Sequence, residues 1–404
     1  MISVAEALKK VTEGFAPLAA EQAALGDCLG RVLAEDVTAR MSQPPCAVSA
    51  MDGYAVRAED VAAVPVTLKR IGESQAGKGF NGRIGNGEVV RIFTGAPLPE
   101  GADSIVIQED TQADGESILI NQAVAAGNFV REAGLDFSEG QVVLKAGRRV
   151  TARDIGLAAA ANRPWLLVRR RPRIAIVATG DELAMPGDPV GPDQIISSNS
   201  LAMTAYVRVL GGEPMTLAIA RDTEESLREV LAAAHGADAI VTIGGASVGD
   251  YDLVRQVLDA DGLELSFYKV AMRPGKPLIF GKIRGVPVLG LPGNPVSAGV
   301  TSAIFLKPAM ERMLGIECGE QIAETALLGC DLDKNGKRQD YMRATLSLNA
   351  AGALTTTPFD RQDSSMMARF ADADCLIVRP PDVPAAKAGE RVEILRLDVG
   401  AQRI

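Results

Sequence analysis

Acidic, hydroxyl-bearing and glycine residues gather in four short segments between residues 178 and 298. The segments are ATGDEL (178–183), ARDTEE (220–225), GGASVGDYD (244–252) and LPGNPVSA (291–298). Glycine N–H groups and helix N-termini bind phosphate directly. Carboxylates such as Asp250 and Asp252 would repel a phosphate, unless a hard divalent cation such as Mg²⁺ bridges the two. The pattern therefore predicts a phosphate-bearing ligand held partly through metal, although each acid taken singly also fits a helix cap or a solvated loop.

A basic turn and a proline-rich loop add to this set. The segment YKVAMRPGKPLIFG (268–281) places cations around a Pro-Gly turn, at Lys269, Arg273 and Lys276. They suit a polyanionic ligand, or else form a solvated basic hairpin. In the loop LPGNPVSA, Pro292 and Pro295 restrict the backbone, Gly293 permits a positive φ, and Asn294 or Ser297 can cap the next helix. This loop is consistent with a rigid wall facing an anion, and equally with a simple helix start.

The elements that position these loops alternate between strand and helix from residue 172 onward. Strands are predicted at the start of RIAIVATGDEL (173–183), in EPMTLAIA (213–220), in DAIVTIGG (238–245) and at 286–291. Helices are predicted at 198–210, at 222–235 with Asp222 or Thr223 as the cap, at 249–259 and after 294. Such alternation indicates a mostly parallel sheet covered on both faces, with ligands at the carboxyl ends of its strands. No GxGxxG follows the first strand and no Walker A sequence is present, so a dinucleotide fold or P-loop is not indicated.

The remainder of the chain has a different sequence pattern. Residues 1–45 and 140–171 are predicted to form a helical and extended arm. Residues 46–139 carry the short alternating runs and glycine turns of a β-rich insert, 172–315 form the central α/β domain, and 316–404 form a small β-barrel or sandwich. The fold class is thus multidomain α/β and β.

Bulk composition excludes several classes of function. The 404 residues carry a net charge of −9, which argues against a nucleic-acid binder. The single histidine, His235, excludes multi-histidine metal sites and disfavours a Ser-His-Asp mechanism. Five cysteines without a CxxC pair fit a reducing compartment, and the N-terminus lacks the apolar core of a signal peptide. No apolar run reaches 18 residues, so a cytoplasmic protein without a membrane span is predicted.

Seven motifs in sequence order carry a family resemblance. They are SAMDGYAV, TGAPLPEGAD, REAGLD, ATGDEL, GGASVGDYD, RPGKP and LPGNPVSA. Together they resemble the molybdopterin molybdotransferases, the molybdenum-insertion enzymes of molybdenum cofactor synthesis, which are related to one domain of gephyrin. The resemblance spans nearly the whole chain. It implies an elongated homodimer of four-domain subunits, with a molybdopterin-binding α/β domain and a C-terminal β-barrel. It also implies that adenylylated molybdopterin and molybdate are converted, with a divalent cation such as Mg²⁺, to molybdenum cofactor and AMP.

The same resemblance assigns residues to roles. It implies catalytic roles for Asp52, Thr94, Asp136, Glu182, Asp222 and Asp252, with Glu182 and Asp252 as metal ligands. It implies substrate binding by Gly244, Gly245, Ser247, Gly249, Lys269, Arg273, Lys276, Pro292, Gly293, Asn294, Pro295, Ser297 and Ser364. Arg273 stands where the family often has lysine. The common QGSH motif is QDSS here, at residues 362–365, which leaves the role of Ser364 and Ser365 open.

The resemblance further implies that the active site lies between two subunits. The loop carrying Asp52 and Thr94 would meet the α/β edge of the partner. A molybdopterin adenylyltransferase and molybdoenzyme maturation proteins are the protein partners it suggests, and neither nucleic acid nor membrane is expected. Two alternatives are an adenylyltransferase, whose family members generally consist of the α/β unit alone, and a non-catalytic gephyrin-like scaffold. The extra domains disfavour the first, and the lack of a long linker and of a fused second α/β domain disfavours the second.

Overall fold

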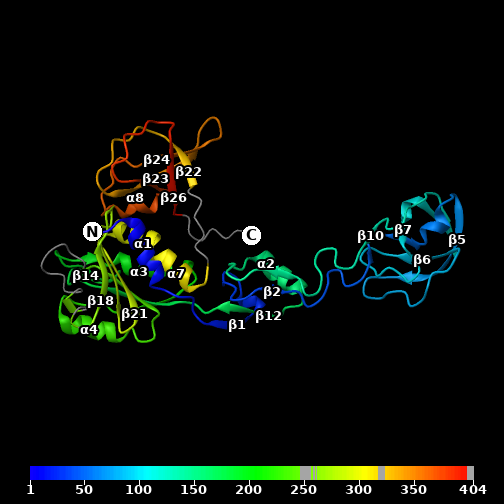
Figure 1. Ribbon diagram of the computed structural model, residues 1–404, viewed down its shortest axis with the longest axis horizontal. Coiled ribbons are helices and arrows are strands. Elements are labelled where there is room, and N and C mark those ends of the chain that lie inside the picture. Colours follow the sequence, from blue (N-terminus) through cyan, green and yellow to red (C-terminus); the bar gives the residue numbers. More distant parts are fainter. Residues whose placement is uncertain (246–255, 258–259, 261, 317–323, 398–404) are drawn as a thin grey trace.

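The central sheet of the α/β domain has six strands, in a computed structural model that describes residues 1–245, 256–257, 260, 262–316 and 324–397. The strand order is β16-β13-β17-β21-β20-β18 (Figure 1). Neighbouring strands are parallel from β16 to β21, and the β21–β20 and β20–β18 pairs are antiparallel. The strands are β13 (Arg173–Ala178), β16 (Glu213–Thr216), β17 (Ala239–Ile243), β18 (Glu264–Lys269), β20 (Pro277–Ile283) and β21 (Val286–Leu291).

Alternate residues of β13 supply two separate cores, because successive strand side chains point to opposite faces. Ile174 and Ile176 pack into the core formed with α1, α3, α6 and α7, whereas Ala175 and Val177 pack toward α4. The helices are α1 (Val4–Glu13), α3 (Ser198–Val209), α4 (Glu224–Ala232), α6 (Pro295–Thr301) and α7 (Lys307–Met313), with a π-helical turn, η4 (Ser302–Leu306), between the last two. The sheet is therefore covered on both faces, as predicted.

Local details differ from the predicted elements in two places. The strand predicted over 213–220 ends at Thr216, although Ala220 still bridges to Thr179. Of the two candidate caps for α4, Thr223 is the one used: its hydroxyl accepts from the Ser226 N–H at 3.2 Å. The helix predicted over 249–259 lies almost entirely outside the described residues.

The insert contains a second six-stranded sheet, in the order β7-β4-β6-β5-β9-β8, at the far end of the molecule from the α/β core (Figure 1). Its strands are β4 (Gly53–Val56), β5 (Val66–Ser74), β6 (Glu88–Ile92), β7 (Ser104–Ile107), β8 (Thr111–Asp114) and β9 (Ser117–Ile120). A two-stranded ribbon, with β3 (Val48–Ser49) paired to β10 (Val130–Arg131), leads into it. The two faces of this sheet pack against separate apolar cores.

The arm between the insert and the α/β core is built from paired short strands and one helix. The pairs are β1 (Ala20–Ala24) with β12 (Trp165–Arg169) and β2 (Val37–Thr38) with β11 (Val142–Leu144). Helix α2 (Ala152–Ala160) starts with a capping box between Thr151 and Asp154. Helix α1, although it precedes the arm in sequence, packs on the α/β core through Val4, Ala7 and Val11.

The C-terminal strands close into a five-stranded barrel, which settles the choice between barrel and sandwich. The order β23-β24-β22-β26-β25 is closed by pairing of β25 with β23. The strands are β22 (Glu324–Leu328), β23 (Gln339–Leu348), β24 (Leu354–Pro358), β25 (Cys375–Arg379) and β26 (Arg391–Arg396), with α8 (Met367–Ala371) between β24 and β25. Strand β19 (Met272–Arg273) of the α/β domain pairs in parallel with β23 and joins the barrel to the core. Across the described residues, no helix is both long and apolar enough to cross a bilayer.

Candidate functional site

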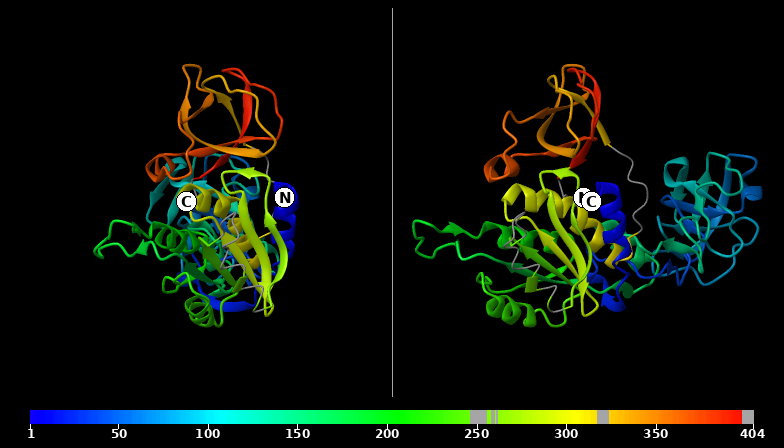
Figure 2. Two further views of the ribbon diagram at one scale, coloured as in Figure 1. Left: turned by 90° about the vertical axis from the view of Figure 1, so that its left-hand side faces the viewer. Right: turned by 60° about the vertical axis from the view of Figure 1, so that its left-hand side comes forward.

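A pocket of about 440 Å³ lies at the carboxyl ends of β13, β17 and β21, where parallel sheets bind ligands. Part of its wall is a short arm that projects from the core, with β14 (Leu183–Ala184) paired in parallel to β15 (Ile195–Ile196) (Figure 2). The lining residues are Ala178, Thr179, Glu182, Leu183, Ile195, Ile196, Ser197, Ser198, Asn199, Ile243, Gly244, Gly245, Pro277, Pro292, Gly293, Asn294 and Pro295.

The floor of the pocket is formed by two glycines in backbone conformations that favour glycine. Gly244 and Gly245 both have positive φ, at 92° and 67°. A Cβ on Gly244 would lie 2.8 Å from the carbonyl oxygen of Thr179, closer than real Cβ contacts. The two glycines therefore let main chain, rather than side chains, face the ligand, as anion-binding loops do.

The Thr179 hydroxyl has no hydrogen-bond partner among the described residues, although the side chain lines the pocket and is 5% exposed. A buried polar group without a partner costs about 1–3 kcal/mol, so native proteins rarely leave one. The hydroxyl oxygen itself is buried beneath the Gly244 turn, so it can reach a polar ligand in the pocket only if that turn shifts. Thr242 Oγ1 on β17 is also unpartnered in the described chain, but Thr242 does not line the pocket.

The acidic residues of the strand-end loops are divided between the pocket and its rim. Glu182 lines the pocket, with its carboxylate folded back over Gly180. Asp222 lies in the neighbouring loop, where it and Asp181 accept hydrogen bonds from each other's backbone N–H groups at 3.4 and 3.3 Å. No cluster of three or more potential metal-ligating side chains occurs within the described parts of the chain. Among the described residues that line the pocket, Glu182 therefore supplies the one carboxylate that could bind a divalent cation.

The loop that follows β21, residues 292–295, is held by hydrogen bonds with α3 and with the segment that contains Ser364. The Asn199 side-chain amide donates to the carbonyl of Gly293 at 2.6 Å. Asn294 occupies the N-cap position of α6, yet its amide donates to the Ser364 hydroxyl at 3.0 Å instead of capping the helix. The backbone carbonyl of Ser364 also accepts a hydrogen bond from the Val296 N–H at 3.1 Å. Ser297 is buried within α6 and does not line the pocket.

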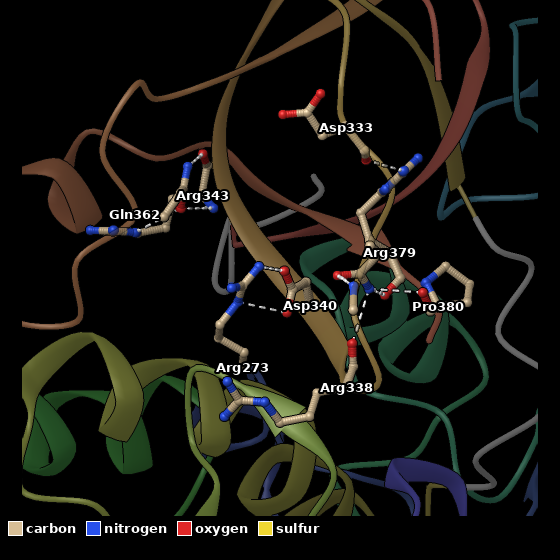
Figure 3. A network of polar contacts seen from close by, with 10 residues as sticks. Arg273, Asp333, Arg338, Asp340, Arg343, Gln362, Arg379 and Pro380 are labelled. Carbon is tan, nitrogen blue, oxygen red and sulfur yellow. Dashed lines mark hydrogen bonds and ion pairs between the residues drawn. The ribbon is translucent and has the colours of Figure 1, made fainter. Parts of the chain in front are cut away.

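Ser364 is in turn positioned by the barrel. Arg343, fully buried on β23, donates to the side chain of Gln362 (Figure 3). It also donates to the carbonyls of Arg361, Asp363 and Met366. The QDSS segment is thereby braced against the barrel. Its contact with the pocket runs through the Ser364 hydroxyl and carbonyl.

The three predicted cations lie in different environments. The Arg273 guanidinium is bound by Asp340 of the barrel through two hydrogen bonds, the Nε bond at 2.8 Å (Figure 3). Arg273 therefore joins two domains and does not line the pocket. Lys269 lies over the Tyr268 ring at 4.9 Å. Lys276 is exposed next to Pro277, which lines the pocket, so Lys276 is the nearest of the three to it along the chain.

Asp52 and Thr94 form a contact of their own in the insert. Asp52 Oδ1 accepts from the Thr94 N–H at 2.7 Å and from its hydroxyl at 2.8 Å. The Thr94 N–H, followed by its hydroxyl, holds the pKa of the Asp52 carboxyl below its usual range. Asp136 is exposed farther along the connecting ribbon, where its N–H donates to the Gln43 carbonyl. Within one chain, the insert sheet next to Asp52 and Thr94 lies at the opposite end of the molecule from the α/β sheet (Figure 1).

The structure brings together Glu182, Gly244, Gly245 and the 292–295 loop, and it separates them from Asp52, Thr94 and Asp136. Asp252, Ser247 and Gly249 lie outside the described residues, so their predicted roles stay predictions. Sequence reasoning missed Thr179, Asn199 and Pro277 as pocket residues. Thr179 was within reach, because it occupies the strand end immediately before the singled-out acids. Asn199 and Pro277 carry no comparable local signal.

Comparison with known proteins gives matches along nearly the whole chain. Family models match in three consecutive parts: the MoeA N-terminal region (domain I and II) at residues 2–162, a probable molybdopterin binding domain at 175–312, and the MoeA C-terminal region (domain IV) at 325–397. A molybdopterin molybdenumtransferase of Nostoc is 35% identical over 379 residues, covering 92% of this chain and 87% of that protein. The Haemophilus influenzae protein of the same name is 32% identical over 398 residues and 98% of each chain.

Solved structures give the same result. Two structures of a molybdopterin biosynthesis MoeA protein from Pyrococcus horikoshii superpose with TM-scores of 0.87 and 0.78. They are 32% and 26% identical, and each comparison covers 98% of this chain and 99% of the other. The similarity therefore extends over the insert, the α/β core and the barrel together.

Proposed function

The chain belongs to the molybdopterin molybdenumtransferase (MoeA) family, and from that membership we propose that it inserts molybdenum from molybdate into adenylylated molybdopterin, releasing AMP. The observation that carries the proposal is the pocket at the strand ends. It combines an unpartnered Thr179 hydroxyl, a glycine floor and a braced proline loop, which suit a phosphate-bearing ligand. Molybdate and adenylyl-molybdopterin are substrates in this proposal.

The reaction we propose has two parts. Two thiol groups of molybdopterin replace one oxo ligand of molybdate, which leaves as water with their two protons. A water oxygen then attacks one phosphorus of the pyrophosphate and the bridging P–O bond breaks, so that AMP leaves with the bridging or the incoming oxygen and the two protons of that water pass to solvent as both phosphates ionise. The Thr179 hydroxyl and the main chain at Gly245 bind phosphate oxygens, and Lys276 beside the pocket offsets their charge. The wall formed by Pro292 and Asn294 fixes the ligand's orientation.

A divalent cation such as Mg²⁺ belongs to the proposal as well. When bound, it would neutralise the developing negative charge on the pyrophosphate. Glu182 is the described pocket carboxylate able to hold it, and Asp252 is the second predicted ligand. Because its pKa is lowered, Asp52 remains ionised at neutral pH. That property suits a contact with a cation better than acceptance of a proton.

We propose a homodimer in which two chains complete each site. The insert sheet, whose strands β4 and β6 adjoin Asp52 and Thr94, lies at the other end of the chain from the α/β sheet that carries the pocket (Figure 1). A second copy can bring its insert to this pocket, as closed two-fold symmetry allows. A chain that sediments as a monomer at micromolar concentration would contradict the shared site. A cytoplasmic location and contacts with an adenylyltransferase and molybdoenzyme maturation proteins are part of the same proposal.

The test is release of AMP from adenylyl-molybdopterin with molybdate and Mg²⁺. We expect Glu182→Gln to lower turnover strongly and to raise the Mg²⁺ concentration needed for half-maximal rate. Asp193→Asn is the matched control, because Asp193 is an exposed acid on the same projecting arm. Equal behaviour of the two variants would contradict the role of Glu182. Adenylylation of molybdopterin from ATP without added molybdate would instead indicate the alternative adenylyltransferase activity.

A further inference from the structure

Arg91 lies beside Asp52 on the insert sheet, with its guanidinium held between two aromatic rings. Antiparallel pairing of β4 with β6 places Tyr54 directly opposite Arg91. Phe93 is two residues farther along the same chain, so its side chain points to the same face. The guanidinium carbon is 5.0 Å from the centroid of each ring. Stacking of this kind restricts a long, otherwise mobile side chain to one place.

The same guanidinium is bound to the main chain around Asp52. Arg91 Nη1 donates to the carbonyl of Gly53 at 3.0 Å, and Nη2 donates to Gln108 Oε1 at 2.6 Å. The Gln108 N–H donates in turn to the carbonyl of Asp52 at 3.1 Å. Arg91 is therefore tied, directly and through Gln108, to the two carbonyls at Asp52 and Gly53.

The other side of this turn is fixed by Thr94, three residues after Arg91. It holds Asp52 Oδ1 with two hydrogen bonds, and no described residue donates to Oδ2. Gly53 cannot be replaced there, because a Cβ would lie 2.0 Å from the Val106 carbonyl oxygen. The end of β6 thus holds both the backbone and one carboxylate oxygen of Asp52, and leaves the other oxygen for a ligand.

The charge of Arg91 is also left without a close carboxylate. Among the described residues it makes no ion pair, unlike Arg83 of the same domain, which pairs with the exposed Glu100. The two Thr94 hydrogen bonds lower the pKa of Asp52 most, and the charge of Arg91 lowers it further. The charge of Arg91 therefore also stabilises the ionised Asp52 carboxylate.

We propose that Arg91 is a positioning residue that fixes the orientation of the Asp52 carboxylate for the reaction. This inference rests on the proposed function, in which Asp52 acts at the pocket of a partner subunit. Arg91 itself need not contact the substrate. Its contribution is to prevent the turn at Asp52 from moving, and a displacement of about 1 Å at a reacting group can cost on the order of a hundredfold in rate.

The experiment measures AMP release by the full-length protein carrying Arg91→Met, Arg91→Lys or the control Arg83→Met. Arg83→Met removes a guanidinium from the same domain without touching the Asp52 turn. We expect Arg91→Met to lower kcat on the order of a hundredfold with a much smaller change in KM. Arg91→Lys should recover part of the loss, because it returns the charge without the planar fork. Arg83→Met should retain wild-type turnover.

A double-variant cycle separates positioning from a general structural role. In an Asp52→Asn background we expect Arg91→Met to cause no further loss, because residues acting through one another are non-additive. Additive losses, or wild-type turnover of Arg91→Met, would overturn the role of Arg91. If Arg91→Met does not fold, the same cycle with Arg91→Lys decides. Full activity of Asp52→Asn alone would instead overturn the shared site on which the inference rests.

Discussion

Replacing Thr179 by valine should make the protein more stable and less active. Both effects follow from the loss of the hydroxyl oxygen. Valine keeps the shape of threonine and removes only the hydroxyl, which is buried and unpartnered among the described residues. An unsatisfied hydroxyl costs about 1–3 kcal/mol, so its removal should stabilise the α/β domain by about 1 kcal/mol. For a domain of this size that corresponds to a rise in Tm of about 2–4 °C.

In the ligand-bound protein the same hydroxyl would bond a phosphate oxygen. A hydrogen bond to a charged group contributes about 1.5–3 kcal/mol, so its loss should weaken AMP binding roughly tenfold to a hundredfold. The assay is calorimetric titration of AMP, alongside thermal unfolding without ligand. Thr242→Val is the control, because Thr242 Oγ1 is equally buried and unpartnered in the described chain but faces no pocket. Both variants should gain stability, and Thr179→Val alone should lose affinity. Unchanged AMP affinity in Thr179→Val would refute the reasoning.

Three further outcomes are expected. Ser364→Ala should lower the rate of AMP release several-fold and Tm by only about 2–4 °C, since about 1 kcal/mol of support for the pocket wall is lost; an unchanged rate would contradict this. Arg273→Ala should leave the buried Asp340 unpaired and destabilise the barrel by about 2 kcal/mol without altering KM, as limited proteolysis would report. Burial raises the pKa of Asp154, but hydrogen bonds from Arg148 and the Thr151 cap outweigh it and hold the value below the ordinary 3.8. The stabilising effect of Asp154 is therefore present above about pH 4 and lost as pH falls through the lowered pKa. At pH 7, Asp154→Asn should lower the free energy of unfolding by about 1 kcal/mol and lower Tm accordingly. In acid, the variant and the wild type should have the same Tm.

The fold could be predicted where a short apolar run is followed by a turn signal. The continuous run from Ile174 to Ala178 indicates a strand buried on both faces, and the structure has one. The choice between Asp222 and Thr223 as the cap could not be made, since both residue types cap helices.

The site could be predicted where a residue directly follows a strand, and not where it depends on another domain. Glu182 and Gly244 reach the pocket because the strands that carry them end there. The substrate-binding role of Arg273 stays a prediction, but its bond to Asp340 could not be foreseen, because Asp340 is 67 positions away in sequence and brought near by the pairing of β19 with β23. The bond from Asn294 to Ser364 depends on the same docking of the barrel. Contacts between residues of different domains leave no local pattern in the sequence that could predict them.

Mixing two impaired variants tests most directly whether the pocket of one chain works with Asp52 of another. Asp52→Asn and Glu182→Gln are each expected to retain only a small residual activity as homodimers. After dissociation and reassociation of an equal mixture, half of the dimers should be mixed, and each of these holds one intact site. Activity should then return to about a quarter of the wild-type value, as two-fold symmetry requires. An equal mixture that stays at the residual activity, although exchange of subunits is demonstrated, would contradict a site shared between chains.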